Sequence, residues 1–134
     1  MRNNKKGFTL IELLVVIAII GLLSTLAVVA LGNARMKSRD ARRVADIKQI
    51  QTALELYFND AGDYPAAVAE GGAIAFSGVT YMNIVPTYPT PPAGSYVYSL
   101  DAAGTYSITY TLEGITGGIA AGAHTATPAS ITDP

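Results

Sequence analysis

The sequence predicts an α+β fold in which one long N-terminal helix packs on a small antiparallel β-sheet. Three observations support this prediction. Residues 13–31 form an apolar run of 19 residues whose only polar side chains are Ser24 and Thr25. Good helix formers then continue to residue 59 without a proline. Residues 95–113 alternate apolar and polar side chains on both sides of a glycine-containing turn, as the strands of a hairpin do.

The apolar run is long enough to cross a lipid bilayer. At about 1.5 Å per helical residue it rises roughly 28 Å, close to the thickness of a hydrocarbon core. Glu12 stands at the start of this run. A charged carboxylate inside hydrocarbon costs on the order of 2.5 to 3.5 kcal/mol, so Glu12 needs a partner and is expected to have a functional role.

Four features occur together around the stretch KGFTLIEL (residues 6–13). They are a basic leader that ends at Gly7, the following Phe8, Glu12 and the long apolar helix. This combination resembles the type IV pilin and type II secretion pseudopilin superfamily, with its prepilin-type cleavage and methylation motif. The resemblance extends over roughly residues 1–65. It implies that a membrane peptidase cuts between Gly7 and Phe8 on the cytoplasmic side and that Phe8 is then methylated.

The resemblance also implies a function and a location. The chain is expected to be a structural subunit of a type IV pilus-like filament, a homo-oligomer polymerised through residues 8–31. Before assembly it would be stored as a single-pass protein of the inner (cytoplasmic) membrane, with its N-terminus in the cytoplasm. The implied partners are the prepilin peptidase and methylase, a pilus or secretion assembly platform, and membrane lipid. Two alternatives stay open: the major pseudopilin of a type II secretion system, and a monomeric membrane-anchored binding domain.

Cleavage would create an ammonium group at Phe8, four residues before Glu12. Opposite charges attract strongly where water is scarce. Within one helix the two groups would lie about one turn apart. Between subunits shifted along a filament axis, Glu12 would instead neutralise a neighbour's amine, which makes burial of both charges conditional on assembly.

The expected organisation has four segments: a leader (1–7), the transmembrane and assembly half of the helix (8–31), its periplasmic half (32–59) and a small β-rich domain (60–134). Gly62 and Pro65 provide the stop signal after the helix. The periplasmic half carries an apolar stripe at three-to-four spacing, formed by Val44, Ile47, Ile50, Leu54 and Phe58.

Beyond the helix, residues 66–94 are predicted to form a loop that wraps it, with a short strand between 79 and 85. Strands are predicted at 95–100 and 105–113. In the second strand, one face is expected to cover the helix, and it carries Tyr106, Ile108, Tyr110 and Leu112. The tail after Gly114 is predicted as irregular coil or a weak edge strand. The chain has no cysteine, unlike the many major pilins that close this region with a disulfide.

Charge is strongly segregated. All nine bases precede residue 49 and stand there with three acids, a net charge of +6, whereas the remainder carries seven acids and no Lys or Arg, a net charge of −7. Because bases flank the apolar run on both sides, charge counting does not orient the helix. A secretory signal peptide is the other interpretation of residues 1–34.

On the helix, Arg42 and Arg43 can each pair with Asp46, but most of the basic residues between 35 and 43 are predicted to be uncompensated locally. Two hypotheses follow. Arg42 and Arg43 could attract Asp60 and Asp63 of a neighbouring subunit and set the stagger of the assembly. Alternatively, the basic band rests on anionic lipid headgroups.

Other chemistry is not expected. The chain offers no catalytic constellation, so it is predicted not to be an enzyme, and His124 is predicted to be a solvent-exposed tail residue. No cofactor is expected except, as a weak candidate, calcium, which major pseudopilins bind in a C-terminal loop. Its candidate ligands are Asp101, Glu113 and Asp133, whose spacing is unlike a compact loop. Nucleic-acid binding is not expected, because the tyrosine-rich half is acidic.

Overall fold

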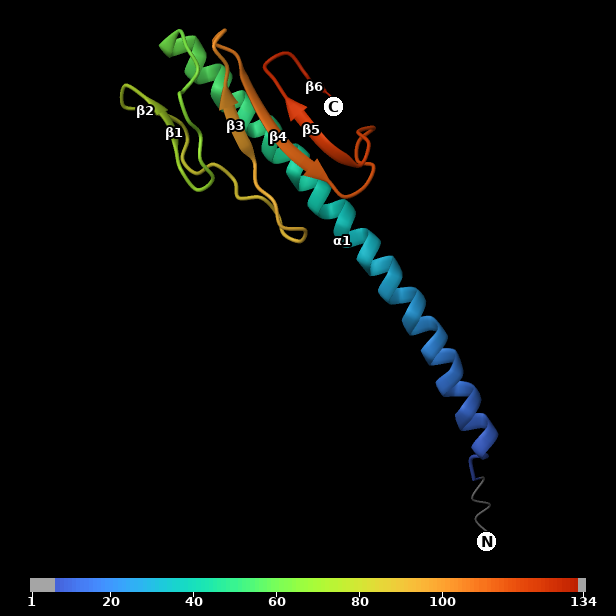
Figure 1. The fold of residues 1–134 in the computed structure, drawn as a ribbon. Helices are drawn as coiled ribbons and strands as arrows, with labels where there is room; N and C mark the ends of the chain where they lie inside the picture. Colours follow the sequence, from blue (N-terminus) through green and yellow to red (C-terminus); the bar gives the residue numbers. More distant parts are fainter. Residues whose placement is uncertain (1–6, 133–134) are drawn as a thin grey trace. The chain divides into compact units, whose positions relative to one another are not determined.

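The computed structural model describes residues 7–132, and the chain divides into two compact units after Arg35. Helix α1 (Leu10–Ala61) belongs to both units, and the strands all belong to the second (Figure 1). The predicted α+β class is therefore confirmed. The predicted stop is confirmed too: the helix ends at a left-handed glycine cap, where Gly62, with φ 81°, donates its N–H to Phe58 O at 2.8 Å.

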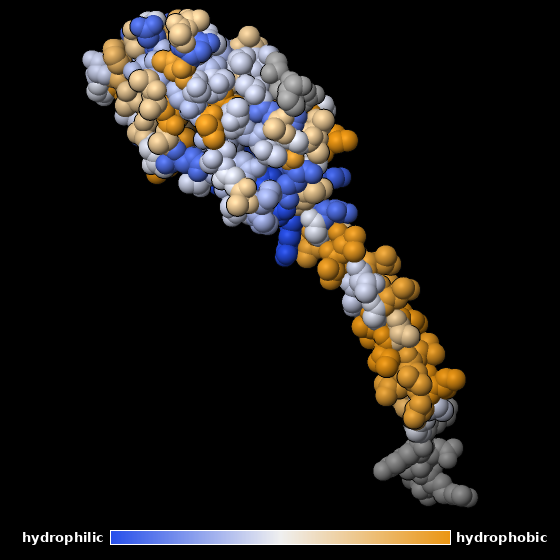
Figure 2. All heavy atoms as spheres, in the orientation of Figure 1, coloured by the Kyte–Doolittle hydropathy of each residue, from blue (hydrophilic) through white to orange (hydrophobic). Residues whose placement is uncertain are grey.

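The first unit is a single apolar helix with no cover in the described chain. Its large apolar side chains between residues 10 and 31 are exposed, from 45% for Val16 to 77% for Leu10. By length and composition this is the one helix among the described residues that could cross a membrane. The face of this unit drawn in Figure 2 is mostly hydrophobic, with a paler patch partway along it. A helix that is apolar all round is stable only in an apolar solvent, which lipid or other helices can supply.

The second unit contains a four-stranded antiparallel sheet and a separate hairpin. The sheet follows chain order, so each strand pairs with the next. Its strands are β3 (Val97–Leu100), β4 (Tyr106–Leu112), β5 (Gly122–Ala126) and β6 (Ile131–Thr132). The hairpin consists of β1 (Ile74–Phe76) and β2 (Val79–Met82).

The β3–β4 hairpin confirms the strongest strand prediction. Asp101 closes its connection by accepting the backbone N–H groups of Ala103 at 2.9 Å and Thr105 at 2.8 Å. The β1–β2 hairpin was predicted only in part, as a strand beginning at residue 79. Its turn residues Ser77 and Gly78 both have positive φ, which suits the twist of a tight hairpin.

The tail after Gly114 contributes more to the sheet than the sequence predicts. β5 lies inside the sheet between β4 and β6, and of these two tail strands β6 alone lies at an edge of the sheet. The Gly- and Ala-rich composition of β5 conceals a strand with alternating burial, in which His124 and Ala126 are buried. Pairing with β4 therefore decides this segment's conformation more than its own propensity does.

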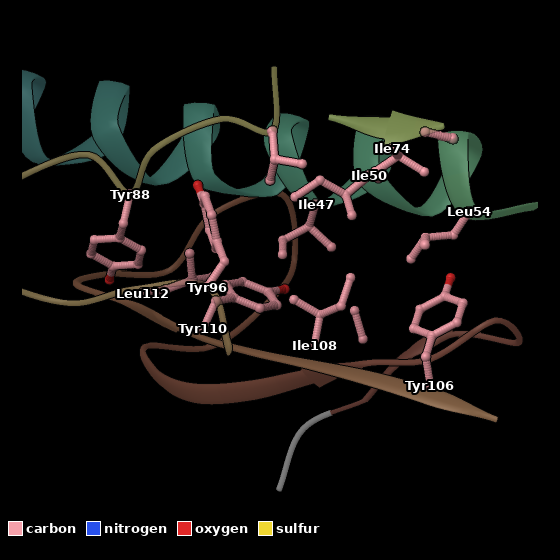
Figure 3. Close-up of a cluster of buried hydrophobic side chains, with 13 residues drawn as sticks. Ile47, Ile50, Leu54, Ile74, Tyr88, Tyr96, Tyr106, Ile108, Tyr110 and Leu112 are labelled. Carbon is pink, nitrogen blue, oxygen red and sulfur yellow. The ribbon is translucent and has the colours of Figure 1, made fainter. Parts of the chain in front are cut away.

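The core lies between the second-unit part of α1 and one face of β4. Figure 3 shows side chains of α1, among them Ile47 and Leu54, directed toward those of β4, among them Ile108. The predicted alternation in β4 is confirmed, since Tyr106, Ile108, Tyr110 and Leu112 are all at most 2% exposed. The predicted helical stripe stops earlier than expected: Phe58 is 40% exposed and its ring stands 4.7 Å from that of Tyr64.

Truncation of the core should show where the second unit's stability resides. Leu54→Ala removes a fully buried side chain and should lower the free energy of unfolding by about 2 to 5 kcal/mol. The control is Leu56→Ala, two residues along the same helix, where the side chain is 50% exposed and the loss should stay within about 0.5 kcal/mol. Denaturant unfolding of the full chain in detergent, followed by near-ultraviolet circular dichroism, measures both. Equal losses would contradict the assignment of the core.

Candidate functional site

The N-terminus of α1 is closed by a reciprocal capping box. The Glu12 carboxylate accepts the backbone N–H of Thr9 at 2.8 Å and the Thr9 hydroxyl at 2.7 Å. In return, the Glu12 N–H donates to Thr9 Oγ1 at 3.3 Å. The backbone N–H groups of Thr9 and Glu12, which have no acceptor within the first helical turn, are thus both hydrogen-bonded. The spacing Thr-x-x-Glu is the signal for this arrangement, and sequence reasoning centred on the charge of Glu12 missed it.

The predicted processing residues lie just outside the helix. Gly7 and Phe8 precede the first residue of α1, and both are exposed. Backbone outside a helix has free hydrogen-bonding groups, which is what a peptidase needs to bind it. Residues 1–6 of the predicted leader lie outside the described residues.

The capping box also places Glu12 close to the amine that cleavage would create. Thr9, whose N–H the carboxylate already accepts, is the residue after Phe8. An ammonium group at Phe8 would therefore appear one residue from the group that Glu12 contacts. In this structure the carboxylate takes part in helix initiation through its own cap.

In the second unit, Arg43 is completely buried among acidic and carbonyl groups. Its Nη1 donates to Asp40 Oδ1 at 2.5 Å and to Glu113 Oε1 at 2.8 Å. Its Nη2 donates to the carbonyl oxygens of Pro89 at 2.6 Å and Pro91 at 3.0 Å. The guanidinium carbon also lies 4.5 Å from the centre of the Tyr88 ring.

Arg39 and Asp40 complete a charge cluster that joins α1 to the end of β4. The charge cluster consists of Arg39, Asp40, Arg43 and Glu113. Arg39 binds Glu113 through two parallel contacts, Nε to Oε1 at 2.8 Å and Nη2 to Oε2 at 2.7 Å. Asp40 accepts the backbone N–H groups of Glu113 at 3.0 Å and Gly114 at 2.8 Å. Two cations and two anions therefore neutralise one another with charge-assisted hydrogen bonds.

The charge cluster corrects the prediction that the bases between 35 and 43 are mostly uncompensated. The local prediction is wrong for Arg43, which pairs with Asp40 three residues earlier. The distant Glu113 also compensates both Arg39 and Arg43, which an argument from the helix alone does not reveal. Buried Arg43 is thus not available to a neighbouring subunit. Arg42 remains accessible: its side chain is 64% exposed and its Nε lies 3.9 Å from Asp46 Oδ2.

The other predicted charged residues are dispersed over the second unit. Asp60, near the C-terminal end of α1, accepts the hydroxyl of Tyr81 at 2.5 Å. Asp63 follows the helix and is exposed. Both acids of the predicted intersubunit pair thus lie at the opposite end of this part of α1 from Arg42.

Asp101 and Glu113, two of the three calcium candidates, lie at opposite ends of β4. Asp101 closes the β3–β4 connection, while Glu113 follows β4 at the strand's other end and is held by two arginines. Asp133 lies outside the described residues. Within residues 7–132, no group of three or more acidic or histidine side chains is arranged to hold a metal ion.

His124 corrects a second prediction. It lies in β5, not in an exposed tail, and is only 2% exposed. Its Nε2 is 2.9 Å from Ala120 O, and its ring centre is 5.6 Å from that of Tyr110, its partner across β4 and β5. Strand pairing buries this side chain, so its role is in packing.

The described chain begins with an exposed apolar helix whose first turn is capped by a glutamate, and a small antiparallel sheet follows the helix in sequence. This arrangement is that of a pilin-like protein. Residues 2–28 match the family model described as the prokaryotic N-terminal methylation motif. The chain belongs to the type IV pilin and type II secretion pseudopilin superfamily, as its relatives in both branches show.

Relatives from the two branches are similarly close. The type IV major fimbrial protein FimA of Dichelobacter nodosus is 33% identical over 116 residues, covering 83% of this chain and 72% of FimA. Type II secretion system core protein G of Pectobacterium carotovorum is 35% identical over 97 residues, 72% of this chain and 60% of that protein. Core protein G of Escherichia coli K12 is 40% identical over 94 residues, 70% of this chain and 59% of that protein. The chain thus spans about 60% of the length of these secretion relatives. No solved structure matches it.

The charge cluster should make the second unit sensitive to acid. Hydrogen bonds from Arg39 lower the pKa of Glu113 to about 2, against an ordinary 4.5, with burial opposing the shift and Arg43 adding to it. Because the folded pKa is depressed, the stabilisation is complete above pH 4.5 and is lost as the pH falls through about 2. Burial raises the pKa of Asp46, so that residue acts with the opposite sign.

We therefore expect Glu113→Gln to lower the free energy of unfolding by about 3 kcal/mol above pH 4.5. The difference from the unmodified chain should shrink steadily between pH 4.5 and 2, where Glu113 itself becomes neutral. Glu55→Gln is the control, since Glu55 is exposed and accepts a hydrogen bond from the neutral Tyr64. Denaturant unfolding across this pH range is the measurement, and a pH-independent difference would show that Glu113 acts through its shape alone.

Proposed function

We propose that this protein is a structural subunit of a type IV pilus-like filament, polymerised by burying residues 8–31 among copies of the same chain. One observation carries the proposal: the first unit is an apolar helix with exposed side chains on all its faces. Lipid covers such a helix in a monomer, and neighbouring helices cover it in a filament. The same surface therefore serves storage and assembly.

Glu12 gives this exchange its specificity. A charged carboxylate in hydrocarbon is destabilising. The hydrogen bonds to Thr9 offset only part of this free-energy cost, because they include no cation. An ammonium group from a neighbouring Phe8 would supply that cation. The proposal thus makes Glu12 the residue that selects a staggered, correctly processed neighbour.

The proposed life cycle has three stages. The chain inserts with its N-terminus in the cytoplasm, where the prepilin peptidase and methylase act on Gly7 and Phe8. It is stored as a single-pass inner-membrane protein and is then passed to an assembly platform. The filament forms outside the cytoplasm. Relatives of this chain are structural subunits, and we propose the same non-catalytic role here.

Secretion is the second candidate function, because relatives named core protein G of type II secretion systems match as well as the fimbrial ones. In that case the filament is a short pseudopilus. Electron microscopy of sheared surface fibres, with peptide mass fingerprinting, distinguishes a surface pilus from a pseudopilus. A chain recovered only as a membrane monomer from cells that carry an active assembly platform would contradict both.

Processing provides the first test. Gly7→Leu should leave the precursor uncut, whereas Gly32→Ala, at a helical glycine with open space around it, should be processed normally. Intact-mass measurement of purified protein should show the mature chain beginning at Phe8 and carrying one extra methyl group. A mature N-terminus near residue 33 or 34 would establish the signal-peptide interpretation instead.

Assembly provides the second test. Glu12→Ala should insert and be cleaved but should lower the yield of sheared filaments at least tenfold, because a buried ammonium group loses its counter-charge. Thr9→Val is the control: it removes the hydroxyl of the cap, at a cost of about 1 kcal/mol, and keeps the carboxylate. Immunoblots of the sheared fraction compare the two. A normal yield from Glu12→Ala would remove the proposed role of the charge.

A further inference from the structure

An open polar cleft of about 410 Å³ lies between α1 and the segment 87–90. Ser38 and Arg42 line it from the helix, and Thr87 and Thr90 line it from the segment opposite. Ser38 and Arg42 are four residues apart, so they share one helix face. Three hydroxyl groups and a guanidinium thus border the same space, and all of them can donate hydrogen bonds.

Arg42 is the cation in this cleft that is free to bind a ligand. Arg39 also lines the cleft, but it gives Nε and Nη2 to Glu113. The contact from Arg42 to Asp46 is 3.9 Å long, and Asp46 already accepts the hydroxyl of Tyr96 at 2.9 Å. With its side chain 64% exposed, Arg42 can turn its planar fork toward an anion.

The wall formed by residues 87–90 is held in place before any ligand binds. Arg43 donates to the carbonyl oxygens of Pro89 and Pro91. The hydroxyl of Tyr88 donates to Thr111 O at 2.7 Å, which ties the segment to β4. A preorganised wall lowers the entropic cost of binding. The charge cluster thus builds one side of the cleft.

The sequence position of the cleft indicates which anion it meets. Ser38 comes seven residues, or about two helical turns, after Leu31, the last residue of the apolar run. Arg35 and Lys37 are exposed in the same stretch. When residues 8–31 occupy the hydrocarbon core, residues at this separation lie at the headgroup level, where phosphodiesters are the abundant anions.

We propose that this cleft binds the phosphate headgroup of an anionic phospholipid while the subunit is stored in the membrane, with Arg42 pairing with the phosphate and the hydroxyls of Ser38, Thr87 and Thr90 donating to its oxygens. The proposal rests on the membrane storage proposed above. It is favoured over pairing with a neighbour's Asp60, because Asp60 already accepts a hydrogen bond from Tyr81. Release of the headgroup would then accompany extraction into the filament.

The test uses the full mature chain in detergent, titrated with phosphatidylglycerol or phosphatidylcholine and followed by native mass spectrometry. Phosphatidylglycerol should bind more tightly than phosphatidylcholine. Arg42→Gln should weaken phosphatidylglycerol binding about tenfold, as loss of a charge-assisted hydrogen bond predicts. The double variant Thr87→Val with Thr90→Val should weaken it several-fold without changing the net charge.

The matched control is Lys48→Gln, which removes one exposed positive charge from the same helix outside this cleft. It should change the affinity less than twofold. Equal losses in Arg42→Gln and Lys48→Gln would show general charge attraction and overturn the site, as would equal binding of the two lipids. A competition experiment with inorganic phosphate tests the source of the phosphate group. If inorganic phosphate binding depends on Arg42 to the same extent and phosphatidylglycerol does not displace it, the cleft binds free phosphate and the lipid assignment is overturned.

Filament yield tests the alternative that Arg42 pairs with a neighbouring subunit. In that case Arg42→Glu should impair polymerisation, and Asp60→Lys with Asp63→Lys should restore it. These two results, together with unchanged phosphatidylglycerol binding in Arg42→Gln, would overturn the lipid site. Insertion is measured independently by alkali extraction of cell membranes. A chain that fails to insert contradicts membrane storage, whereas a chain that inserts normally and binds no phosphatidylglycerol contradicts only the lipid site.

Discussion

The second unit depends on the burial of one positive charge. Arg43 is completely excluded from solvent, and an unpaired charge in that position would cost several kcal/mol. Asp40, Glu113 and two proline carbonyls are therefore required as partners. Because Asp40 also accepts the N–H groups of Glu113 and Gly114, the cluster determines where the end of β4 meets α1. Such a cluster is weak evidence for net stability, since desolvation opposes it, but it specifies one arrangement of helix, sheet and loop.

Tyrosine hydroxyls perform a related task in a domain that has no disulfide. A small domain buries a limited apolar area, and several of its tyrosines contribute a hydrogen bond as well as packing. Tyr88 donates to Thr111 O, Tyr96 to Asp46 and Tyr98 to Pro65 O, and each of these bonds joins segments far apart in the sequence. Together with the charge cluster, they hold the Pro-rich segment and the β3–β4 hairpin in place without covalent links.

The polar residues of α1 have different roles because they have different surroundings. Glu12 stands at the start of an apolar helix, where a carboxylate is costly unless a cation joins it, so its chemistry is suited to assembly. Arg43 is already neutralised, so its chemistry is structural. Arg42, its neighbour in the sequence, is 64% exposed, and its Nε lies 3.9 Å from Asp46 Oδ2. Two arginines at successive positions of one helix thus differ sharply: Arg43 is buried in the charge cluster, and Arg42 is accessible to solvent.

The sequence by itself determined the features that rest on local periodicity and on solvent preference. These include the long helix, its stop at Gly62, the alternation in β4 and the motif around Glu12. Only the tertiary structure decided which groups meet across long separations. Arg43 and Glu113 are 70 residues apart, and their pairing exists because β4 packs on α1 at one register. His124 is buried because β5 pairs with β4, although the composition around it resembles a loop. Local sequence records the preference of each residue for water or for a given backbone conformation, but the partner of a buried charge is selected by the packing of whole elements, and no single segment contains that information.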